Sequence, residues 1–207
     1  MAKIIVISNR KGGTGKSTLC MQFANYLSSI GKDVAVLDVD PQQSIIDLRN
    51  REVETNPDVP LPWQVWNASE NTKAFIDKAK SMGDGYILVD CPGTINQSLQ
   101  SVFEAADAIV MPFRYDDLVV SSTFSFVKVL LKTGIKAKRL FLPNCIDARV
   151  KMPNEEPVKT EFRKVGTILP RIKQGVAIQR VSTLKPIDTY QQKAVMYTME
   201  EILKEVD

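Results

Sequence analysis

Short apolar runs alternate along the chain with longer segments in which apolar residues recur every three or four positions. The first pattern is typical of buried strands and the second of amphipathic helices. We expect strands at residues 3–8, 33–37, 63–66, 86–90, 108–112, 139–142 and 165–169, and helices at 17–30, 44–54, 71–82, 97–106, 118–133 and 189–206. Polar or proline-rich loops are expected at 56–62 and 152–157, and a short helix is expected to end between 161 and 166.

The order of these elements predicts the fold class. Strands separated by helices favour an α/β fold, a mostly parallel twisted sheet with helices on both faces. A length of 207 residues favours one domain over residues 1–207. Ligands of such sheets bind beyond the carboxyl ends of the strands. We therefore expect the functional residues in the loops that follow the strands.

A glycine-rich loop lies between the first strand and the first helix, and it reads Lys11-Gly12-Gly13-Thr14-Gly15-Lys16-Ser17-Thr18. Glycines allow a tight turn that points backbone N–H groups at an anion, and the helix N-terminus adds positive charge. Lys16 can reach the β- and γ-phosphates of a nucleotide, and the Ser17 hydroxyl can ligate Mg²⁺. The usual first glycine of a P-loop falls at Arg10, and the loop has a second lysine, Lys11. The alternatives are a chance glycine-rich turn and a dinucleotide fingerprint, which would need glycine at Thr18.

Three aspartates follow strands at the same expected edge of the sheet. Asp38 and Asp40 come after the second strand, two residues apart, so on an extended backbone they point the same way. Asp90 ends the apolar run of the strand at 86–90. Carboxylates beside a phosphate repel it unless Mg²⁺ or an ordered water lies between them. The alternative interpretation is a polar strand end with turn chemistry at Asp40 and Pro41.

Composition excludes several kinds of chemistry. The chain has no histidine, which excludes Ser-His-Asp and Cys-His catalysis and histidine metal sites. Cys20, Cys91 and Cys145 are too far apart for a zinc or redox motif and fit a reducing cytoplasm. No apolar run approaches the roughly 20 residues of a membrane span. Because the first strand begins near residue 3, we expect no signal peptide.

Three motifs together resemble the deviant Walker A ATPases of the ParA/MinD class. They are the loop at 11–18, the segment 36–42 with its D-x-D-P-Q box, and the segment 86–93, which is similar to a Walker B strand. The resemblance covers residues 1–145 well, and the D-x-D-P-Q box is more like ParA partition proteins than MinD. It implies the P-loop NTPase fold, with ATP and Mg²⁺ as ligands.

The resemblance also implies roles for single residues. Lys11 would cross to the nucleotide of a second protomer in an ATP-bound sandwich homodimer, and Lys16 would bind phosphate in its own protomer. Asp40 would orient the attacking water and contact the metal sphere, and Asp38 would hold a metal-bound water. Asp90 would reach Mg²⁺ through water. The alternative for Lys11 is a lysine that only screens phosphate in its own subunit.

Base recognition rests on two segments. Asn144 stands at a strand end where the class often places an asparagine against adenine, and Pro170 lies in a segment whose family counterpart touches the base. Asn144 and Asp147 also match N-x-x-D, a weak trace of the guanine-reading N-K-x-D motif. The resemblance favours ATP over GTP.

Charge is concentrated in the second half of the chain. Residues 128–193 carry 15 basic and 5 acidic side chains, an excess that can attract an anionic polymer. Arg171, Lys173 and Arg180 are the candidate contacts for non-specific, salt-sensitive DNA binding. The alternative is a solvated basic face without a partner.

The resemblance favours a ParA-like partition ATPase, and it implies slow, Mg²⁺-dependent turnover that a ParB-type adaptor stimulates. It would be cytoplasmic and nucleoid-associated, and would segregate a plasmid or mobile element. The helix-turn-helix region of larger relatives and the basic N-terminal arm of some small ones are not expected. A MinD-like positioning ATPase would need a basic amphipathic C-terminal helix, whereas the tail at 199–207 is acidic, so no membrane partner is expected. A metabolic enzyme of the dethiobiotin synthetase type remains an alternative, and the cysteines do not suit an iron protein of the nitrogenase type.

Overall fold

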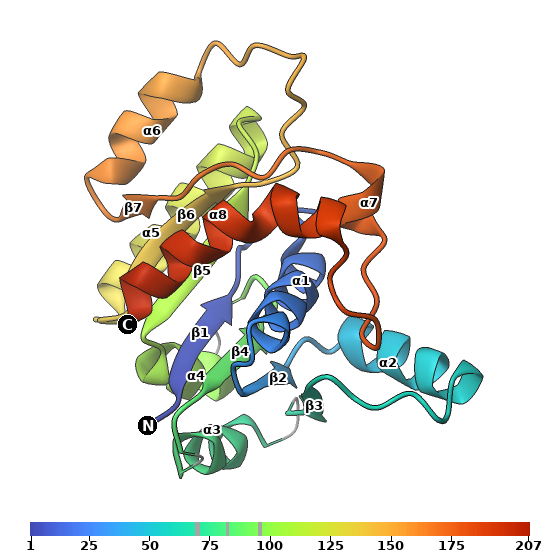
Figure 1. Cartoon of the computed structure of the whole chain (residues 1–207). Coiled ribbons are helices and arrows are strands. Elements are labelled where there is room, and N and C mark those ends of the chain that lie inside the picture. The colour runs from blue at the N-terminus through green and yellow to red at the C-terminus, as the bar shows by residue number, and fades with distance from the viewer. Residues whose placement is uncertain (69–70, 82, 95–96) are drawn as a thin grey trace.

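Parallel strands form the centre of the protein. The computed structural model describes residues 1–68, 71–81, 83–94 and 97–207. Within these residues one sheet has the strand order β3-β2-β4-β1-β5-β6-β7 (Figure 1). The strands are β1 (Lys3–Ile7), β2 (Val34–Asp38), β3 (Gln64–Asn67), β4 (Tyr86–Asp90), β5 (Ala108–Phe113), β6 (Lys138–Pro143) and β7 (Thr167–Ile168), and their pairings are parallel.

Helices cover both faces of this sheet, as the alternating pattern predicts. They are α1 (Lys16–Ser29), α2 (Ser44–Thr55), α3 (Thr72–Ser81), α4 (Gln97–Ala105), α5 (Asp117–Lys132), α6 (Glu155–Arg163), α7 (Val176–Gln179) and α8 (Thr189–Val206). One hydrophobic core includes residues of α3, α4, α5 and α6, and the other includes residues of α1, α2, α7 and α8. The α/β fold with helices on both faces is confirmed.

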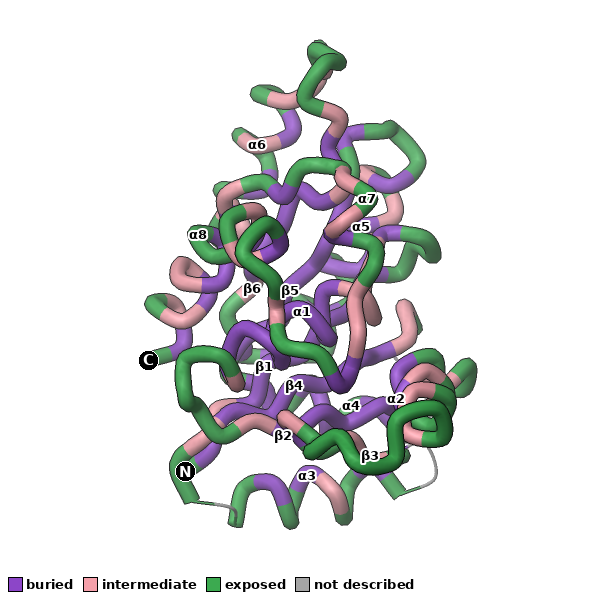
Figure 2. The backbone as a smooth tube through the Cα atoms, turned by 45° about the vertical axis from the view of Figure 1, so that its right-hand side comes forward, coloured by how far each residue is buried: buried purple, intermediate pink, exposed green. Residues whose placement is uncertain are grey.

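Strand β1 shows why its sequence is apolar throughout. Ile4 and Val6 belong to one core, and Ile5 and Ile7 belong to the other. Successive side chains of a strand point to opposite faces, so a strand covered on both sides needs apolar residues at every position. Figure 2 shows the buried residues following the central strands, with exposed residues in the outer loops.

Outside 152–166, each expected strand and helix is present, and its ends differ from the expected ones by at most two residues. Met82, the expected end of the helix at 71–82, lies outside the described residues. The loop at 56–62 is confirmed. The predicted loop at 152–157 is wrong for residues 155–157, because α6 begins at Glu155. Pro157 lies in the first turn of α6, where proline is tolerated. Two glutamates in the same turn suit the helix dipole. The four-residue helix α7 was not expected.

An aromatic cluster packs α6 against the sheet. The ring of Phe162 stacks on Phe141 with centroids 4.2 Å apart and meets Phe113 edge-on at 5.0 Å. Phe124 of α5 lies 4.4 Å away on the same ring. Phe162 is fully buried, so it joins α5, α6, β5 and β6 in one contact.

Replacing Phe162 by alanine should remove these ring contacts. We expect the free energy of unfolding to fall by about 3–5 kcal/mol, because the ring is buried and the site cannot collapse fully. Urea denaturation at 25 °C measures the change. The control is Tyr197→Ala on the exposed side of α8, for which we expect a change within about 0.5 kcal/mol; similar losses in both variants would contradict the role of the cluster.

Candidate functional site

The glycine-rich loop connects β1 to α1, as the sequence predicts. Gly13 and Gly15 have φ of +73° and +87°, a region that favours glycine. Gly15 stands at the N-cap of α1 without a side-chain cap. A helix start without a side-chain cap leaves N–H groups that suit an anion. Lys11, Gly12 and Gly13 are exposed, Thr14 is buried, and Gly15 to Thr18 are half-buried.

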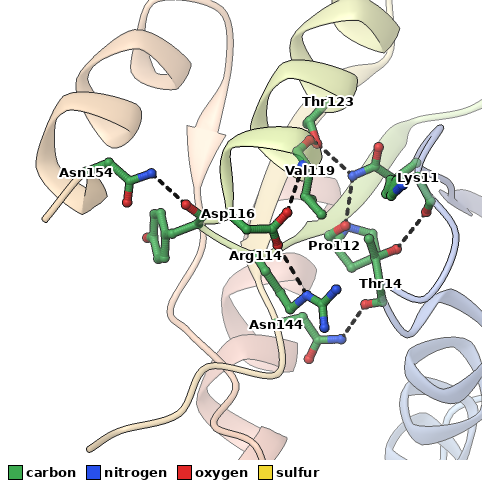
Figure 3. A network of polar contacts seen from close by, with 11 residues as sticks. Lys11, Thr14, Pro112, Arg114, Asp116, Val119, Thr123, Asn144 and Asn154 are labelled. Atoms are coloured by element: carbon green, nitrogen blue, oxygen red, sulfur yellow. Dashed lines mark hydrogen bonds and ion pairs between the residues drawn. The ribbon is translucent and has the colours of Figure 1, made fainter. Parts of the chain in front are cut away.

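Asn144 supports this loop from the end of β6. Its Nδ2 donates to the backbone oxygen of Thr14 at 2.9 Å (Figure 3). A Cβ on Gly15 would lie 2.6 Å from the same nitrogen. The structure therefore brings Asn144, which the resemblance assigns to the base, against the glycine-rich loop at 11–18, called the phosphate loop below for its proposed role.

Asn9 is a supporting residue that the sequence did not reveal. It is fully buried just before the loop, and its Nδ2 donates to the oxygen of Pro112 at 2.9 Å and to Oγ1 of Thr123 at 2.8 Å. These bonds tie the loop to β5 and α5. Nothing in the local pattern marks an asparagine as a bridge to residues more than 100 positions away.

The segment after β4 passes directly beneath the loop. A Cβ on Gly93 would lie 2.3 Å from the backbone oxygen of Asn9 and 2.4 Å from the Cα of Arg10. Because only glycine allows this approach, the segment after β4 and the start of the glycine-rich loop are held in contact.

Asp90 is the most unusual ionisable group of the site. It is fully buried, and neither carboxylate oxygen has a hydrogen-bond partner among the described residues. Burial raises the pKa of Asp90 to about 7; Asp38 and Asp40 add to the rise, while the nearby Ser17 hydroxyl and Lys16 ammonium oppose it. Burying a carboxylate without a partner is costly, and a bound cation would compensate its charge.

The residues around Asp90 fit Mg²⁺. An unpartnered Asp90 and the Ser17 hydroxyl lie together beneath the loop. Mg²⁺ takes one or two protein oxygens, with water and phosphate oxygens completing its octahedron. Among the described residues no group of three or more Cys, Asp or Glu side chains is arranged to hold a metal ion by itself, which is compatible with a metal site that the nucleotide completes.

Asp38 has a role that its spacing did not suggest. It is fully buried, and its Oδ2 accepts from the backbone N–H groups of Ile45 at 3.1 Å and Ile46 at 3.3 Å, in the first turn of α2. Its Oδ1 accepts from the N–H of Asp40 at 3.3 Å. Burial raises the pKa of Asp38, and these N–H donors oppose the rise. The contact to a metal-bound water stays a prediction.

Asp40 lies half-buried in the turn that leads into α2. Its Oδ1 accepts from the N–H of Gln42 at 3.0 Å, and its backbone oxygen accepts from Gln43 at 2.9 Å. Gln43 has φ of +48°, an uncommon conformation for a residue other than glycine. The expected turn chemistry is present, with one contact to the carboxylate and one to the backbone oxygen of Asp40.

The base-binding candidates lie at one edge of the sheet. Pro143 ends β6, and its oxygen accepts from the N–H of Ile172 at 2.9 Å, so the segment containing Pro170 runs beside Asn144. The oxygen of Pro170 accepts from Thr198 at 3.0 Å. Neighbouring Cys145 has φ of +56°.

The basic candidates lie on the surface next to this edge. Arg171, Lys173 and Arg180 are exposed. Arg171 and Lys173 line a groove of about 690 Å³ with Lys193 and Tyr190 of α8, whereas Arg180 does not. Glu155 forms an ion pair with Arg171, so the charge of Arg171 is partly neutralised.

The family is shown by comparison with known proteins. The family model described as ATPase MipZ matches residues 3–127, more than half of the chain. The chain belongs to the MipZ ATPase family. The expected ParA/MinD class is thereby confirmed, and the match spans the phosphate loop, the Asp38–Asp40 segment and β4.

Individual relatives of this MipZ-family ATPase include members of the same ParA/MinD class. The chain is 27% identical to the sporulation initiation inhibitor protein Soj of Bacillus subtilis, over 83% of this chain and 85% of Soj. It spans only about half the length of other curated relatives, 57% and 48% in two cases.

Solved structures with the same fold include a plasmid partition protein of Borrelia burgdorferi, with a TM-score of 0.77, 19% identity and full coverage of both chains. Another is the septum site-determining protein MinD of Pyrococcus horikoshii, complexed with Mg-ADP, with a TM-score of 0.69, 19% identity and coverage of 98% and 96%. Among the described helices, none has the length and apolar character that a membrane crossing requires.

The raised pKa of Asp90 predicts a pH dependence of stability in the nucleotide-free protein with EDTA. A carboxyl whose pKa is raised on folding stabilises the protein below its unfolded pKa, and this contribution is lost as the pH rises through about 7. From pH 5 to pH 8 the wild type should therefore lose on the order of 2–3 kcal/mol relative to Asp90→Asn. Urea denaturation of both proteins at the two pH values measures this, and a difference that does not change with pH would contradict the assignment.

Proposed function

We propose that this MipZ-family ATPase is a ParA-like partition switch. ATP binding would join two protomers face to face, the dimer would bind DNA without sequence preference, and slow hydrolysis would release both. Its task would be segregation of a plasmid or mobile element. The observation that carries the proposal is the exposed Lys11 on a phosphate loop beneath which Asp90 lies buried without a partner.

The loop supplies the binding energy for the phosphates. Its N–H groups and Lys16 would hold the β- and γ-phosphates at the start of α1, where the helix dipole favours negative charge. Ser17 would hold Mg²⁺, Asp90 would reach it through water, Asp38 would hold a metal-bound water and Asp40 would contact the metal sphere. The cation, when bound, neutralises charge on the phosphate oxygens.

Hydrolysis would use the fixed turn before α2. Asp40 would accept a hydrogen bond from the attacking water and orient it towards the γ-phosphate. Its two backbone-anchored contacts, to Gln42 and Gln43, support this positioning role. Catalysis of phosphoryl transfer is mostly positioning and charge stabilisation, which suits a chain without histidine.

Lys11 would act on the nucleotide of the partner protomer. It is exposed at a loop whose own phosphate site already has Lys16, so its charge is available to a second nucleotide. In that position it would stabilise charge on the leaving oxygens as an arginine finger does. ATP would then be the ligand that joins the dimer, with Asn144 and the segment at Pro170 beside the base.

DNA contact would come from the exposed basic surface around Lys173 and Arg180. Arg171 would contribute less, because Glu155 is its ion-pair partner. A ParB-type adaptor would stimulate turnover and so time the release, in the nucleoid-associated cytoplasm. A MinD-like positioning ATPase and a metabolic enzyme of the dethiobiotin synthetase type are the alternatives, and the DNA experiment below separates them from the partition switch.

Lys11→Ala should uncouple nucleotide binding from dimerisation. We expect ATP affinity within a few-fold of wild type, loss of the ATP-dependent dimer, and turnover reduced roughly 100-fold or more, because a charge that stabilises the transition state is removed. Analytical ultracentrifugation and single-turnover assays measure these effects. Arg10→Ala, the exposed neighbouring residue, is the matched control. A Lys11→Ala protein that dimerises on ATP and hydrolyses it normally would rule out the trans role.

DNA binding should depend on ATP and on the exposed basic residues. At fixed salt we expect binding with ATP but not with ADP or without nucleotide, and longer-lived binding for Asp40→Ala. Lys173→Glu and Arg180→Glu should each weaken binding uniformly across sequences and reduce the salt dependence by about one phosphate contact. Lys32→Glu, an exposed change distant from the basic surface, is the control. No binding in any nucleotide state would favour the alternatives.

A further inference from the structure

Helix α2 follows the Asp38–Asp40 segment directly and buries few apolar side chains. Along Ser44–Thr55 only Ile45 and Arg49 are buried. A helix with so little buried apolar surface gains little stability from packing. Ile45 is buried in the core and Leu48 packs partly against it, so the position of α2 depends also on the polar contacts of Arg49.

The guanidinium of Arg49 makes three hydrogen bonds in a buried setting with 4% of its surface exposed. Its Nε donates to Oγ1 of Thr183 at 2.8 Å, its Nη1 to the oxygen of Trp63 at 2.9 Å, and its Nη2 to the oxygen of Thr183 at 3.0 Å. Its central carbon lies 4.2 Å from the centroid of the Trp63 ring. Lysine cannot reproduce this combination of a planar fork and stacking.

Glu52 completes the arrangement one turn further along α2. It accepts from the N–H of Thr183 at 2.7 Å and from the hydroxyl of the same residue. The Thr183 hydroxyl thus accepts from Arg49 and donates to Glu52. Burial lowers the pKa of Arg49 and the Glu52 carboxylate opposes the change, so the buried charge has a partner. We name Arg49, Glu52 and Thr183 the α2 clamp.

The segment that carries Thr183 is also bound to α1, the helix that starts at the phosphate loop. Asn25 of α1 donates to the oxygen of Ser182 at 2.8 Å, and Gln22 of α1 donates to the oxygen of Ile178. Trp63 donates from its indole to Asn25 at 2.8 Å. Residues 178–183 therefore contact α1 on one side and α2 on the other.

Movement of α2 would be transmitted directly to Asp40. Ile45 and Ile46 in the first turn of α2 bind the carboxylate of Asp38, and Gln43 binds the backbone oxygen of Asp40. The turn around Asp40 and the start of α2 are thus one hydrogen-bonded unit. Whatever sets the position of α2 relative to α1 also sets the position of Asp40 relative to the phosphate loop.

We propose that Arg49 is a positioning residue for hydrolysis, which acts through Thr183 to hold Asp40 at a fixed distance from the phosphate loop. The inference rests on the proposed role of Asp40 as the residue that orients the attacking water. Displacement of a reacting group by about 1 Å can cost roughly 100-fold in rate, so a loosened clamp should affect the chemical step more than nucleotide binding.

Thr183→Val tests the clamp, because it removes the hydroxyl and leaves the shape of the side chain. We expect kcat to fall roughly tenfold or more, while the affinity for a non-hydrolysable ATP analogue stays within about twofold. Thr183→Ser, which restores the hydroxyl, should return kcat close to wild type. Arg49→Lys, which keeps the charge without the fork, should behave like Thr183→Val. Thr160→Val, an exposed change in α6, is the matched control.

Hydrogen exchange gives a readout that does not depend on turnover. In Thr183→Val the amides of Gln42, Gln43, Ile45 and Ile46 should exchange faster than in wild type, and the amides of α1 should be unchanged. A merely structural role would instead accelerate exchange in both helices.

Two results would overturn the inference. One is unchanged kcat and unchanged exchange in a folded Thr183→Val protein. The other is a parallel loss of kcat and nucleotide affinity with faster exchange in α1. If the wild type turns over no ATP, the proposed function fails, and the exchange data alone decide whether the clamp holds the Asp40 turn. If Thr183→Val does not fold, Arg49→Lys and Thr183→Ser are compared in the same assays with the same criteria.

Discussion

The parallel register around β4 is the constraint on which the site depends. Asp90, the last residue of β4, is in register with Ile7 of β1 on one side and with Asp38 of β2 on the other. Because the three strands run in the same direction, they end at one edge of the sheet. The phosphate loop, the turn at Asp40 and the segment at Gly93 therefore leave the sheet together, and no long loop is needed to bring them into contact.

This register has an electrostatic cost, because it buries two carboxylates side by side. The protein resolves the two charges differently. Asp38 accepts hydrogen bonds from the first turn of α2, so it is satisfied within the fold. Asp90 has no such donor, and its pKa is raised to about 7. The fold thus leaves one carboxylate whose charge a bound cation would compensate, so ligand binding and the stability of the site are coupled.

The second half of the chain surrounds this edge and holds its parts in relation to one another. Asn144 of β6 supports the phosphate loop, and the connection from α7 to α8 contacts both α1 and α2. The same half carries most of the basic charge, but not all of it is available to a ligand. Arg171 is paired with Glu155, and Arg149 with Asp147, so the count of basic residues overstates the field that an anion would meet.

The sequence by itself determined the strands, the helices other than α7, the glycine-rich loop between β1 and α1, and the three aspartates at one sheet edge, because each depends on local periodicity or on a short motif. It misjudged the start of α6, where Pro157 occupies a permitted place in a first turn. The tertiary structure alone decided that Asp38 accepts hydrogen bonds from the first turn of α2, that Asn9 and Asn144 support the loop, and that Arg49 binds Thr183. Those contacts join residues up to 134 positions apart, and a hydrogen bond between distant residues leaves no periodic trace in either segment.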